Sequence, residues 1–553
     1  MLTKNVCYAL EHQRSWGPSH PSVISQSSSA PRLTYIKMPR QTLQVYLNND
    51  FGRLRNYLLR MDTLRFEFDN SYAKLPERFY SRIPPTKVKK PQLVMINEAL
   101  ADSLALNPDA LRSRIGTSVL AGNHVPDGAE PLAMAYAGHQ FGGFVPQLGD
   151  GRAILLGEII DRNEVRQDIH LKGAGRTPYS RGGDGRAPLG PVLREYIVSS
   201  FMNMLSIPTT RSLAVATTGE AVYREDVLPG AILARVADSH LRIGTFEYFA
   251  VRRDIEALQI LTSFAIKRHF PEFYGGPHPA KKLLESVLRR QSKLVAKWIS
   301  VGFVHGVMNT DNTSIAGETI DYGPCAFMDT YRSDKVFSSI DHAGRYAFMN
   351  QPDILQWNLA QLAQCLLPLI DEQTDSAVSI AKDIIGRFPE IFAEDLGREF
   401  GCKLGLTCEP SDTLSIAFAL LDLMSEYSAD FTLSFRYLAD AVLDDQAAEL
   451  FLQQFDQPAV VHEWLSHWRS RVAEDNGSPE TAQQKLLAAN PAVIARNHLV
   501  EEVIRFAEDR GDFAPLHNLM AELKEPFKER PYQSKYAKPP SSDEEVKITF
   551  CGT

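Results

Sequence analysis

A glycine-dense segment followed by two apolar runs marks the first third of the chain. The runs cover residues 153–160 and 165–171, and a polar stretch at 161–164 separates them. Two apolar runs of strand length around a short polar turn predict a β-hairpin. The second run ends on Lys172, and Gly149 and Gly151 precede the first run. The predicted order is therefore glycine loop, strand, turn, strand and lysine.

Apolar residues at helical spacing dominate the rest of the chain. Leu193, Ile197 and Phe201 recur at helical spacing in a predicted helix over 188–207, which also contains Glu195. The sequence also predicts one more strand and several more helices. The strand is expected over 231–236, and the helices over 97–106, 282–302, 353–367, 413–423 and 486–510.

The change from mixed to helical patterns near residue 245 divides the chain. Residues 61–245 hold the predicted strands, residues 246–524 are mainly helical, and residues 525–553 form a proline-punctuated tail that we expect to be irregular. A chain of 553 residues is too long for one small core, so two lobes with appendages are expected. The predicted fold class is α+β, with a mixed N-terminal lobe and a mainly helical C-terminal lobe.

The first 60 residues differ from the rest in charge. They hold eight lysines and arginines against two acidic residues, with a serine-rich stretch over 22–29. This balance is typical of an organelle transit peptide. The alternative is a start assigned too far upstream, with Met61 as the true first residue, and we favour it because ordinary globular sequence begins there. A cytoplasmic location is then expected, or a mitochondrial one if residues 1–60 are a transit peptide.

Composition argues against several classes of function. The net charge of −8 disfavours a general nucleic-acid-binding protein, because phosphate backbones require a cationic surface. No apolar run approaches the roughly 20 residues that span a bilayer, so no membrane segment is expected. The six cysteines are scattered without the paired spacing of a zinc site, as in a protein of a reducing compartment. We expect a monomer.

The most informative motif lies in the helical part, where VHGVMNTDN over 304–312 is followed by Asp321-Tyr322-Gly323. It resembles the protein-kinase loops in which His-x-Asp precedes an Asn, and an Asp-Phe-Gly turn holds magnesium. Here Val307 stands in the position of the kinase base, and the nearest carboxylate is Asp311. We therefore predict Asp311 as the general base, and Asn312 and Asp321 as ligands of a divalent metal.

Convergence of the two metal ligands requires a turn between them. A hairpin centred on Gly317 would bring Asn312 and Asp321 together. The alternative for the Thr-Asp-Asn sequence is a capped turn without chemistry, and the Asp-Tyr-Gly that follows favours the metal site. We expect His305 to brace the loop rather than to act as a base.

Candidate phosphate-binding residues precede that motif. Gly149 and Gly151 would let backbone donors approach a phosphate, and Arg152 and Lys172 supply positive charge. The alternative for Lys172 is a solvated surface lysine, and Glu195 is either its orienting partner or an exposed helix residue. Other cationic candidates are the three arginines within 176–187, together with Arg235 and Arg242. A bound triphosphate would explain this many arginines in an acidic protein.

Several independent motifs resemble those of the selenoprotein O (YdiU-like) protein adenylyltransferases. Besides the 304–312 motif, they are YAGHQFGGF over 136–144, LGDGR over 148–152, HLKGAGR over 170–176, YSRGGDGRA over 179–187 and IDYGP over 320–324. The motifs occur in the family's order, and the resemblance covers residues 61–553. It implies a protein-kinase-like, pseudokinase fold that binds ATP in an inverted orientation and transfers AMP to Ser, Thr or Tyr hydroxyls of protein substrates.

The resemblance also implies roles for individual residues. Asp311 would be the proton acceptor, and Asn312 and Asp321 would hold Mg²⁺ or Mn²⁺. The implied nucleotide contacts are Gly149, Gly151, Arg152, Lys172, Asp184, Gly185, Arg235, Arg242 and Asp321. Cys551 stands near the C-terminus, where many eukaryotic members carry selenocysteine, and a regulatory disulfide with Cys325 is a further hypothesis.

Alternative activities remain open at this point. UTP is an alternative donor, because no base-reading pocket is recognisable in the sequence. A kinase-like phosphotransferase is the second alternative, and Val307 in place of the usual Asp argues against it. An inert nucleotide-binding scaffold is the third, and the presence of both predicted metal ligands, Asn312 and Asp321, argues against it.

Overall fold

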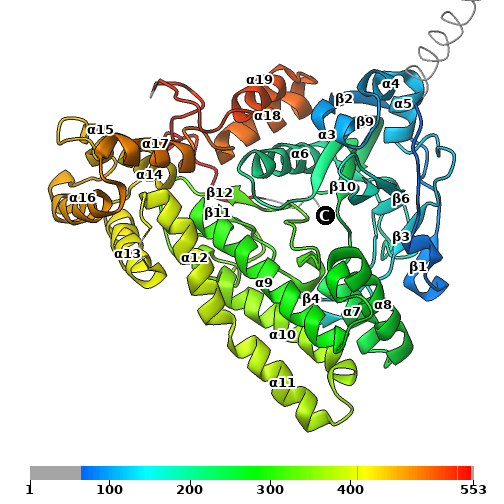
Figure 1. Cartoon of the computed structure of the whole chain (residues 1–553). Coiled ribbons are helices and arrows are strands. Elements are labelled where there is room, and N and C mark those ends of the chain that lie inside the picture. Colours follow the sequence, from blue (N-terminus) through cyan, green and yellow to red (C-terminus); the bar gives the residue numbers. More distant parts are fainter. Residues whose placement is uncertain (1–63, 408, 532, 550–553) are drawn as a thin grey trace, which may run out of the picture. The chain divides into compact units, whose positions relative to one another are not determined.

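The computed structural model describes residues 64–407, 409–531 and 533–549. The predictions for residues 1–60 and for Cys551 lie outside the described residues. Within the described part, the chain combines one large antiparallel sheet with many helices, so the mixed α and β content is as predicted (Figure 1).

The large sheet has eight strands, and its main path runs β1-β3-β6-β7-β10-β9-β2, with β8 paired to β10. The strands are β1 Tyr80–Arg82, β2 Gln92–Ile96, β3 Leu132–Met134, β6 Ala153–Ile160, β7 Arg166–Lys172, β8 Ala187–Pro188, β9 Arg211–Tyr223 and β10 Val227–Ala237. The predicted hairpin is β6 and β7, and the strand expected over 231–236 is the central part of β10. The register pairs Ala153 with Lys172 and Leu233 with Lys172, so the lysine ends the middle strand of three.

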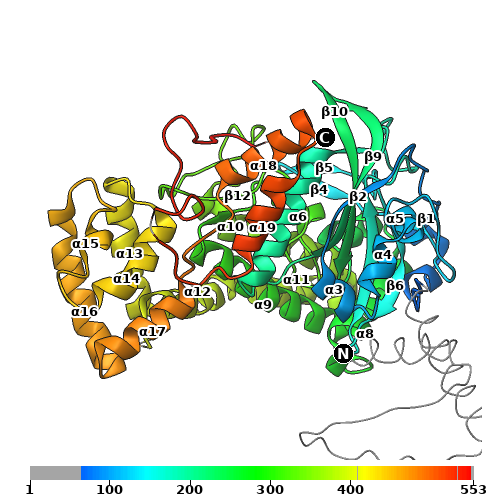
Figure 2. The same ribbon diagram turned by 90° about the horizontal axis from the view of Figure 1, so that it is seen from above.

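Helices cover both faces of this sheet and build the rest of the chain. The first ones are α3 Glu98–Ser103, α4 Pro108–Arg112, α5 Arg114–Leu120, α6 Leu189–Met204, α7 Ile243–Ala250, α8 Ile255–His269, α9 Pro279–Ser300 and α10 Gln351–Ile370. The later ones are α11 Thr374–Gly386, α12 Phe388–Leu404, α13 Pro410–Glu426, α14 Phe431–Ala441, α15 Glu449–Leu452, α16 His462–Asn476, α17 Pro479–Ala489, α18 Asn497–Arg510 and α19 Ala514–Leu523. Helix α6 packs between the β9–β10 part of the sheet and α18 (Figures 1 and 2).

The apolar run of β6 follows from burial on both faces of the sheet, whereas β7 has only Ile169 and Leu171 between polar residues and buries Asp168 and His170 as well. Ile154 and Leu156 belong to a smaller apolar cluster that includes residues of α3 and α5, whereas Leu155 belongs to the large cluster on the opposite face. Successive side chains of a strand point to opposite faces, so a strand covered on both sides reads as a continuous apolar run. This burial fixes β6 and β7 and thereby the position of Lys172.

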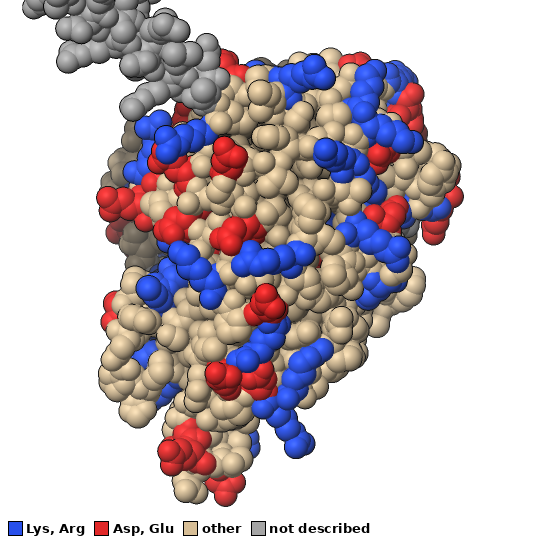
Figure 3. Space-filling view, turned by 90° about the vertical axis from the view of Figure 1, so that its right-hand side faces the viewer, with Lys and Arg blue, Asp and Glu red and all other residues tan. Residues whose placement is uncertain are grey.

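Charged side chains are interspersed on the face of the molecule that Figure 3 shows. Basic and acidic residues of the described chain alternate across it without forming a field of one sign. The dense cationic cluster of the described structure lies instead inside the cavity discussed below.

Two predicted elements were wrong in their details. The helix expected over 486–510 is divided into α17 and α18, because Pro491 lacks a backbone N–H and restricts the residue before it. The predicted hairpin around Gly317 has the expected turn, with φ +81° at Gly317, but its arms pair elsewhere. Ser314 bridges to Arg242 and Thr319 to Thr209, so neighbouring segments rather than each other hold the two arms.

The described part of the tail after residue 525 contains no helix, as predicted. It is tied to the helical part by Arg496, which is 1% exposed and donates to the Ala537 carbonyl at 3.2 Å. The same guanidinium pairs with Asp430 at 2.8 Å and contacts Asp329. One buried cation therefore holds three segments together.

Replacing Arg496 with alanine should lower the free energy of unfolding by about 3–5 kcal/mol, because two largely buried carboxylates lose their shared partner. Urea denaturation measures the change. Arg332→Ala is the matched control, since Arg332 and Asp334 form an exposed pair of the kind that adds little stability. Equal denaturation midpoints for the two variants would contradict this account of Arg496.

Candidate active site

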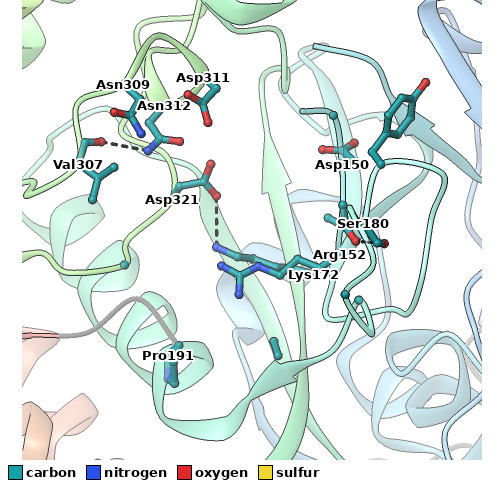
Figure 4. Close-up of a pocket in the computed structure, with 18 of the residues that line it drawn as sticks. Asp150, Arg152, Lys172, Ser180, Pro191, Val307, Asn309, Asp311, Asn312 and Asp321 are labelled. Carbon is teal, nitrogen blue, oxygen red and sulfur yellow. Dashed lines mark hydrogen bonds and ion pairs between the residues drawn. The ribbon is translucent and has the colours of Figure 1, made fainter. Parts of the chain in front are cut away.

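A cavity of about 550 Å³ opens between the sheet, α6 and the loop that carries the 304–312 motif (Figure 4). The structure brings all the sequence-predicted site residues to this one cavity, although they come from segments far apart in the chain. The predicted residues that line it are Gly149, Gly151, Arg152, Lys172, Asp184, Gly185, Arg235, Arg242, Asp311, Asn312 and Asp321.

Lys172 is not a solvated surface lysine. Its side chain is 13% exposed, and its Nζ contacts the carboxylate of Glu195 on α6 and Asp321 Oδ1 at 3.2 Å. Glu195 is itself only 2% exposed, which also excludes the exposed-helix alternative for this residue. The pair holds the lysine at the inner wall of the cavity, with its ammonium group directed at Asp321 (Figure 4).

Asp321 is the common partner of three cations. Its Oδ1 accepts from Lys172 and from Arg235 at 2.7 Å, and its Oδ2 accepts from Arg242 at 2.9 Å. Burial by itself would raise the pKa of this carboxyl, but the three cations outweigh it and hold the pKa well below its ordinary value. Asp321 also has φ +62°, a conformation that non-glycine residues seldom adopt. The carboxylate is therefore kept ionised in the site.

Two stacked histidines orient Arg235. The rings of His170 and His240 lie 4.1 Å apart, and Arg235 donates to His170 Nδ1 at 3.1 Å and to His240 Nε2 at 3.2 Å. Each imidazole uses its other nitrogen on a buried carboxylate, His170 on Asp150 and His240 on Asp168. Burial lowers the pKa of both histidines, so each is neutral and accepts a hydrogen bond from the guanidinium. His170 was recognised only as part of the HLKGAGR motif, and no sequence pattern indicated that its ring stacks on that of His240.

Arg242 joins the cation cluster to the loop over 304–312. It donates to the Asp311 carbonyl at 2.7 Å as well as to Asp321, and its guanidinium lies 4.6 Å from the centre of the Tyr136 ring. The residue is 2% exposed. It therefore fixes the backbone of the Asp311 turn relative to Asp321.

The glycine-rich segments are required by the packing of the loops themselves. Gly149 has φ +78°, and a Cβ there would lie 2.4 Å from the Tyr179 ring. At Gly185, with φ +70°, a Cβ would lie 2.1 Å from the Gly175 carbonyl. The packing of the loops alone therefore accounts for glycine at these two positions.

The expected anion clamp over 176–187 is only partly present. Arg186 lines the cavity, but its guanidinium donates to the Thr86 and Lys87 carbonyls and pairs with Glu220, so its charge is already engaged in holding loops together. Arg181 lines the cavity, and Arg176 is exposed outside its lining. A cation that sequence reasoning missed is Arg224, which pairs with Asp184 at 3.0 Å on the cavity wall.

Asp311 lies in a single 3₁₀ turn, Thr310–Asn312, and its side chain lies within the cavity lining. Its Oδ2 accepts from Gln140 Nε2 at 3.2 Å, while its buried Oδ1 has no hydrogen-bond partner in the described structure. Burial raises the pKa of Asp311 to about 6, against the opposing effect of Arg242. A carboxylate of this kind can accept a proton near neutral pH.

The neighbouring loop residues are fixed by hydrogen bonds. His305 is fully buried, accepts from Val307 N and contacts the Ile320 carbonyl at 2.9 Å through Nε2, so it braces the loop as predicted. Asn312 donates through Nδ2 to the Val307 carbonyl at 3.0 Å, which leaves its amide oxygen on the cavity side (Figure 4).

The donor set of Asn312 and Asp321 fits a small divalent cation. Such ions take few, hard oxygen ligands from the protein and share the remainder with phosphates and water. No group of three or more His, Cys, Asp or Glu side chains suited to a metal occurs among residues 64–407, 409–531 and 533–549. Cys325 is buried beside this loop, and its proposed partner Cys551 lies outside the described residues.

Sequence reasoning assigned no chemistry to three cavity residues that touch the predicted ones. Gln140 bonds to Asp311, the Tyr136 ring lies against the Arg242 guanidinium, and the Asn309 carbonyl accepts from Asn312 N at 3.0 Å. All three line the cavity. Their motifs, YAGHQFGGF and VHGVMNTDN, were recognised as distinctive, but only the folded chain shows that the two segments meet.

Comparisons with known proteins agree with the resemblance. The sequence model of the family "Protein adenylyltransferase SelO" matches residues 62–524. A protein nucleotidyltransferase YdiU of Rhodopseudomonas palustris (strain BisB5) is 54% identical over 491 residues, which is 89% of this chain and 100% of the relative. The protein of the same name from Bradyrhizobium diazoefficiens is also 54% identical over 491 residues, with the same coverage. Within the described residues, we find no helix with the length and apolar character needed to cross a membrane.

Proposed function

The chain belongs to the SelO family of protein adenylyltransferases, and from that premise we propose that it transfers AMP from ATP to Ser, Thr or Tyr hydroxyls of proteins, with Asp311 as the general base. Nucleotide transfer onto proteins is the activity of the family. The donor, the metal and the residue roles are our proposal. The observation that carries it is the convergence of a carboxylate, Asp311, and a cluster of cations around Asp321 in one cavity.

We propose a protein-kinase-like arrangement with an N-lobe over 61–245, a C-lobe over 246–524 and a tail over 525–553. The order of elements supports it: glycine loop, β6, β7 with Lys172, α6 with Glu195, and then the catalytic loop and Asp321-Tyr322-Gly323. The contact between Lys172 and Glu195 is the ion pair that kinases use to orient the phosphate-binding lysine.

The triphosphate would be held by Arg152, Lys172, Arg235 and Arg242, with Gly149, Gly151, Asp184 and Gly185 forming the adjoining wall. Three of these cations, Lys172, Arg235 and Arg242, share Asp321 as their counter-ion in the structure. A bound triphosphate takes over that role through charge-assisted hydrogen bonds. When the phosphates replace Asp321 as the counter-ion of these cations, the carboxylate oxygens of Asp321 are released from the ion pairs.

Asn312 and the released Asp321 would hold Mg²⁺ or Mn²⁺ against the phosphates. When bound, the ion neutralises charge that develops on the phosphate oxygens. The other contributions come from the chain itself. Lys172 and the two arginines keep the polyphosphate in place, and Arg242 holds the turn that carries Asp311 at a fixed position relative to it.

In the transfer step, the hydroxyl oxygen of the substrate protein bonds to the α-phosphorus, and the bond from that phosphorus to pyrophosphate breaks. Asp311 takes the hydroxyl proton, for which a pKa of about 6 is suitable. Val307 occupies the position of the kinase base and carries no group that could accept a proton. This difference favours attack at the α-phosphate over the γ-phosphate transfer of a kinase.

ATP labelled on the α-phosphate should therefore label an acceptor protein, whereas ATP labelled on the γ-phosphate should release its label as pyrophosphate. Chelation of divalent ions should stop the incorporation, and Mg²⁺ or Mn²⁺ should restore it. UTP labelled on the α-phosphate provides the comparison of donors. Incorporation of the γ-label would establish a kinase instead, and a lack of incorporation from either nucleotide would favour the inert scaffold.

A further inference from the structure

A short hairpin outside the large sheet lies against the catalytic loop. Its strands are β4 Gly138–Gln140 and β5 Gly143–Val145, and they pair only with each other among the described residues. The two residues between them, Phe141 and Gly142, both have positive φ, +51° and +84°. A two-residue hairpin turn of this type needs positive φ at both positions, and Phe141 adopts it although it has a bulky side chain.

Three successive residues of this hairpin bond to three successive residues of the catalytic loop. His139 N donates to Thr310 Oγ1 at 2.7 Å, and Phe141 N donates to Asn309 Oδ1 at 3.1 Å. Between them, Gln140 Nε2 donates to Asp311 Oδ2 at 3.2 Å. The positive φ of Phe141 thus accompanies a hydrogen bond to the loop, and backbone conformations of this kind are maintained where the surroundings require them.

Glu247 on α7 contacts both the hairpin and the loop. Its Oε1 lies 2.6 Å from His139 Nδ1, and its Oε2 accepts from the Thr310 hydroxyl at 2.6 Å. One buried carboxylate therefore bridges the hairpin and the loop. The Phe141 ring also packs 5.1 Å from the Tyr346 ring, whose hydroxyl bonds to Asn309.

The hairpin holds the two oxygens of Asp311 in different ways. Gln140 bonds to Oδ2. The buried Oδ1 instead lies against the backbone of Gly138, where a Cβ would come within 2.5 Å of that oxygen and within 2.9 Å of the Asp311 Cβ and Cγ. The carboxylate occupies this place only because residue 138 has no side chain.

We propose that the β4–β5 hairpin positions the catalytic carboxylate, with Gln140 orienting Oδ2 of Asp311 and Gly138 leaving the space that the side chain needs. This inference rests on the proposed role of Asp311 as general base. Gln140 and Gly138 are positioning residues, since they act on the reaction through Asp311. The hairpin thereby supplies a hydrogen-bond donor for the Asp311 carboxylate that the loop itself does not provide. Asp311 has no other side-chain hydrogen-bond partner in the described structure.

A pair of glycine substitutions in the same hairpin tests the space at Asp311. In Gly138→Ala the new methyl group must displace the carboxylate, and a misplacement of about 1 Å can lower a rate about 10²-fold. Gly143→Ala is the matched control, because its nearest neighbour is the Gln140 carbonyl at an ordinary 3.4 Å. Transfer of α-labelled AMP to casein, as a general acceptor, should fall about 10²-fold in the first variant and less than about twofold in the second. Equal rates in the two variants would overturn the proposal.

Gln140→Ala tests the hydrogen bond without adding bulk. We expect kcat to fall about 5- to 10-fold, the effect of losing one hydrogen bond to a charged group, with an unchanged ATP dissociation constant and an unchanged KM for casein. The decisive measurement is a double-mutant cycle with Asp311→Asn. If Gln140 acts through Asp311, removing it from the Asp311→Asn variant should cause no further loss of the residual, radiochemically measured rate.

Multiplicative losses in that cycle would show that Gln140 acts elsewhere, and they would overturn its positioning role. Failure of the proposed function gives a different result, since Asp311→Asn alone would then transfer AMP at the wild-type rate. Thermal midpoints and ATP titrations of each variant separate a local effect on Asp311 from a loss of the fold.

Discussion

Asp311→Asn is expected to bind ATP with near-normal affinity and to transfer AMP about 10²–10⁴-fold more slowly than the wild type. The substitution preserves the size of the side chain and removes its basicity. Nucleotide binding should survive, because the cations around the cavity bond to Asp321 and to the backbone carbonyl of residue 311, not to the Asp311 carboxylate. Calorimetry measures the affinity, and the mass shift of an acceptor protein measures the transfer.

The control for this variant is Asp334→Asn, which also removes one carboxylate but on the exposed surface. It should leave both measurements unchanged. If Asp311→Asn abolishes ATP binding, Asp311 holds the metal or the loop instead of acting as the base. Transfer at the wild-type rate would mean that another group accepts the proton, and the proposed mechanism would fail.

The local sequence pattern was sufficient to predict the strand that ends on Lys172 and the helix that carries Glu195. Strand β6 is a mainly apolar run because both faces of the sheet are covered, and α6 shows helical spacing because it packs on that sheet. Strand β7 contributes only Ile169 and Leu171 to the apolar cluster, between polar residues. The break at Pro491 was also readable, since proline disrupts a helix interior, and the long helix predicted there overlooked it.

Contacts between distant segments were not predictable from pattern. Strand β9 carries small residues such as Ala214, Ala216 and Gly219, which weaken any apolar signal, and it was missed although it pairs along most of β10. Gln140 was read only as part of a glycine-rich stretch. Its hydrogen bond to Asp311 spans 171 positions of the chain.

For the candidate site, too, local features could be predicted from the sequence, and contacts between distant segments could not. Individual residues could be proposed from motifs, because glycines, a lysine and an Asp-Tyr-Gly sequence have characteristic spacings. The electrostatic interactions among these residues could not be predicted from motifs. That Lys172, Arg235 and Arg242 converge on one carboxylate depends on the pairing of β7 with β10 and on the bridge between Arg242 and Ser314. Because three cations share Asp321, replacing this carboxylate should have a large effect on nucleotide binding and transfer.

Asp321→Asn should lower AMP transfer by about 10²–10³-fold, because it removes the carboxylate that we propose as a ligand of the metal ion that stabilises charge on the reacting phosphate. It should also change ATP binding in a way that Asp311→Asn does not. Asp321 pairs with Lys172, Arg235 and Arg242, so in the proposed mechanism it competes with phosphates for these cations. Without that competitor, the three cations should bind metal-free ATP more tightly, while added Mg²⁺ should no longer strengthen the binding.

Calorimetry with ATP in the presence of a chelator, and then of Mg²⁺, separates these effects, and a thermal midpoint confirms that the variant is folded. Asp311→Asn is the comparison, since it should retain the wild-type response of ATP affinity to Mg²⁺. An Asp321→Asn variant whose ATP binding still tightens with Mg²⁺ would show that the ion is held by other groups. Weaker binding of metal-free ATP would show that the carboxylate organises the cations rather than competing for them, and the exchange of counter-ions proposed for nucleotide binding would be wrong.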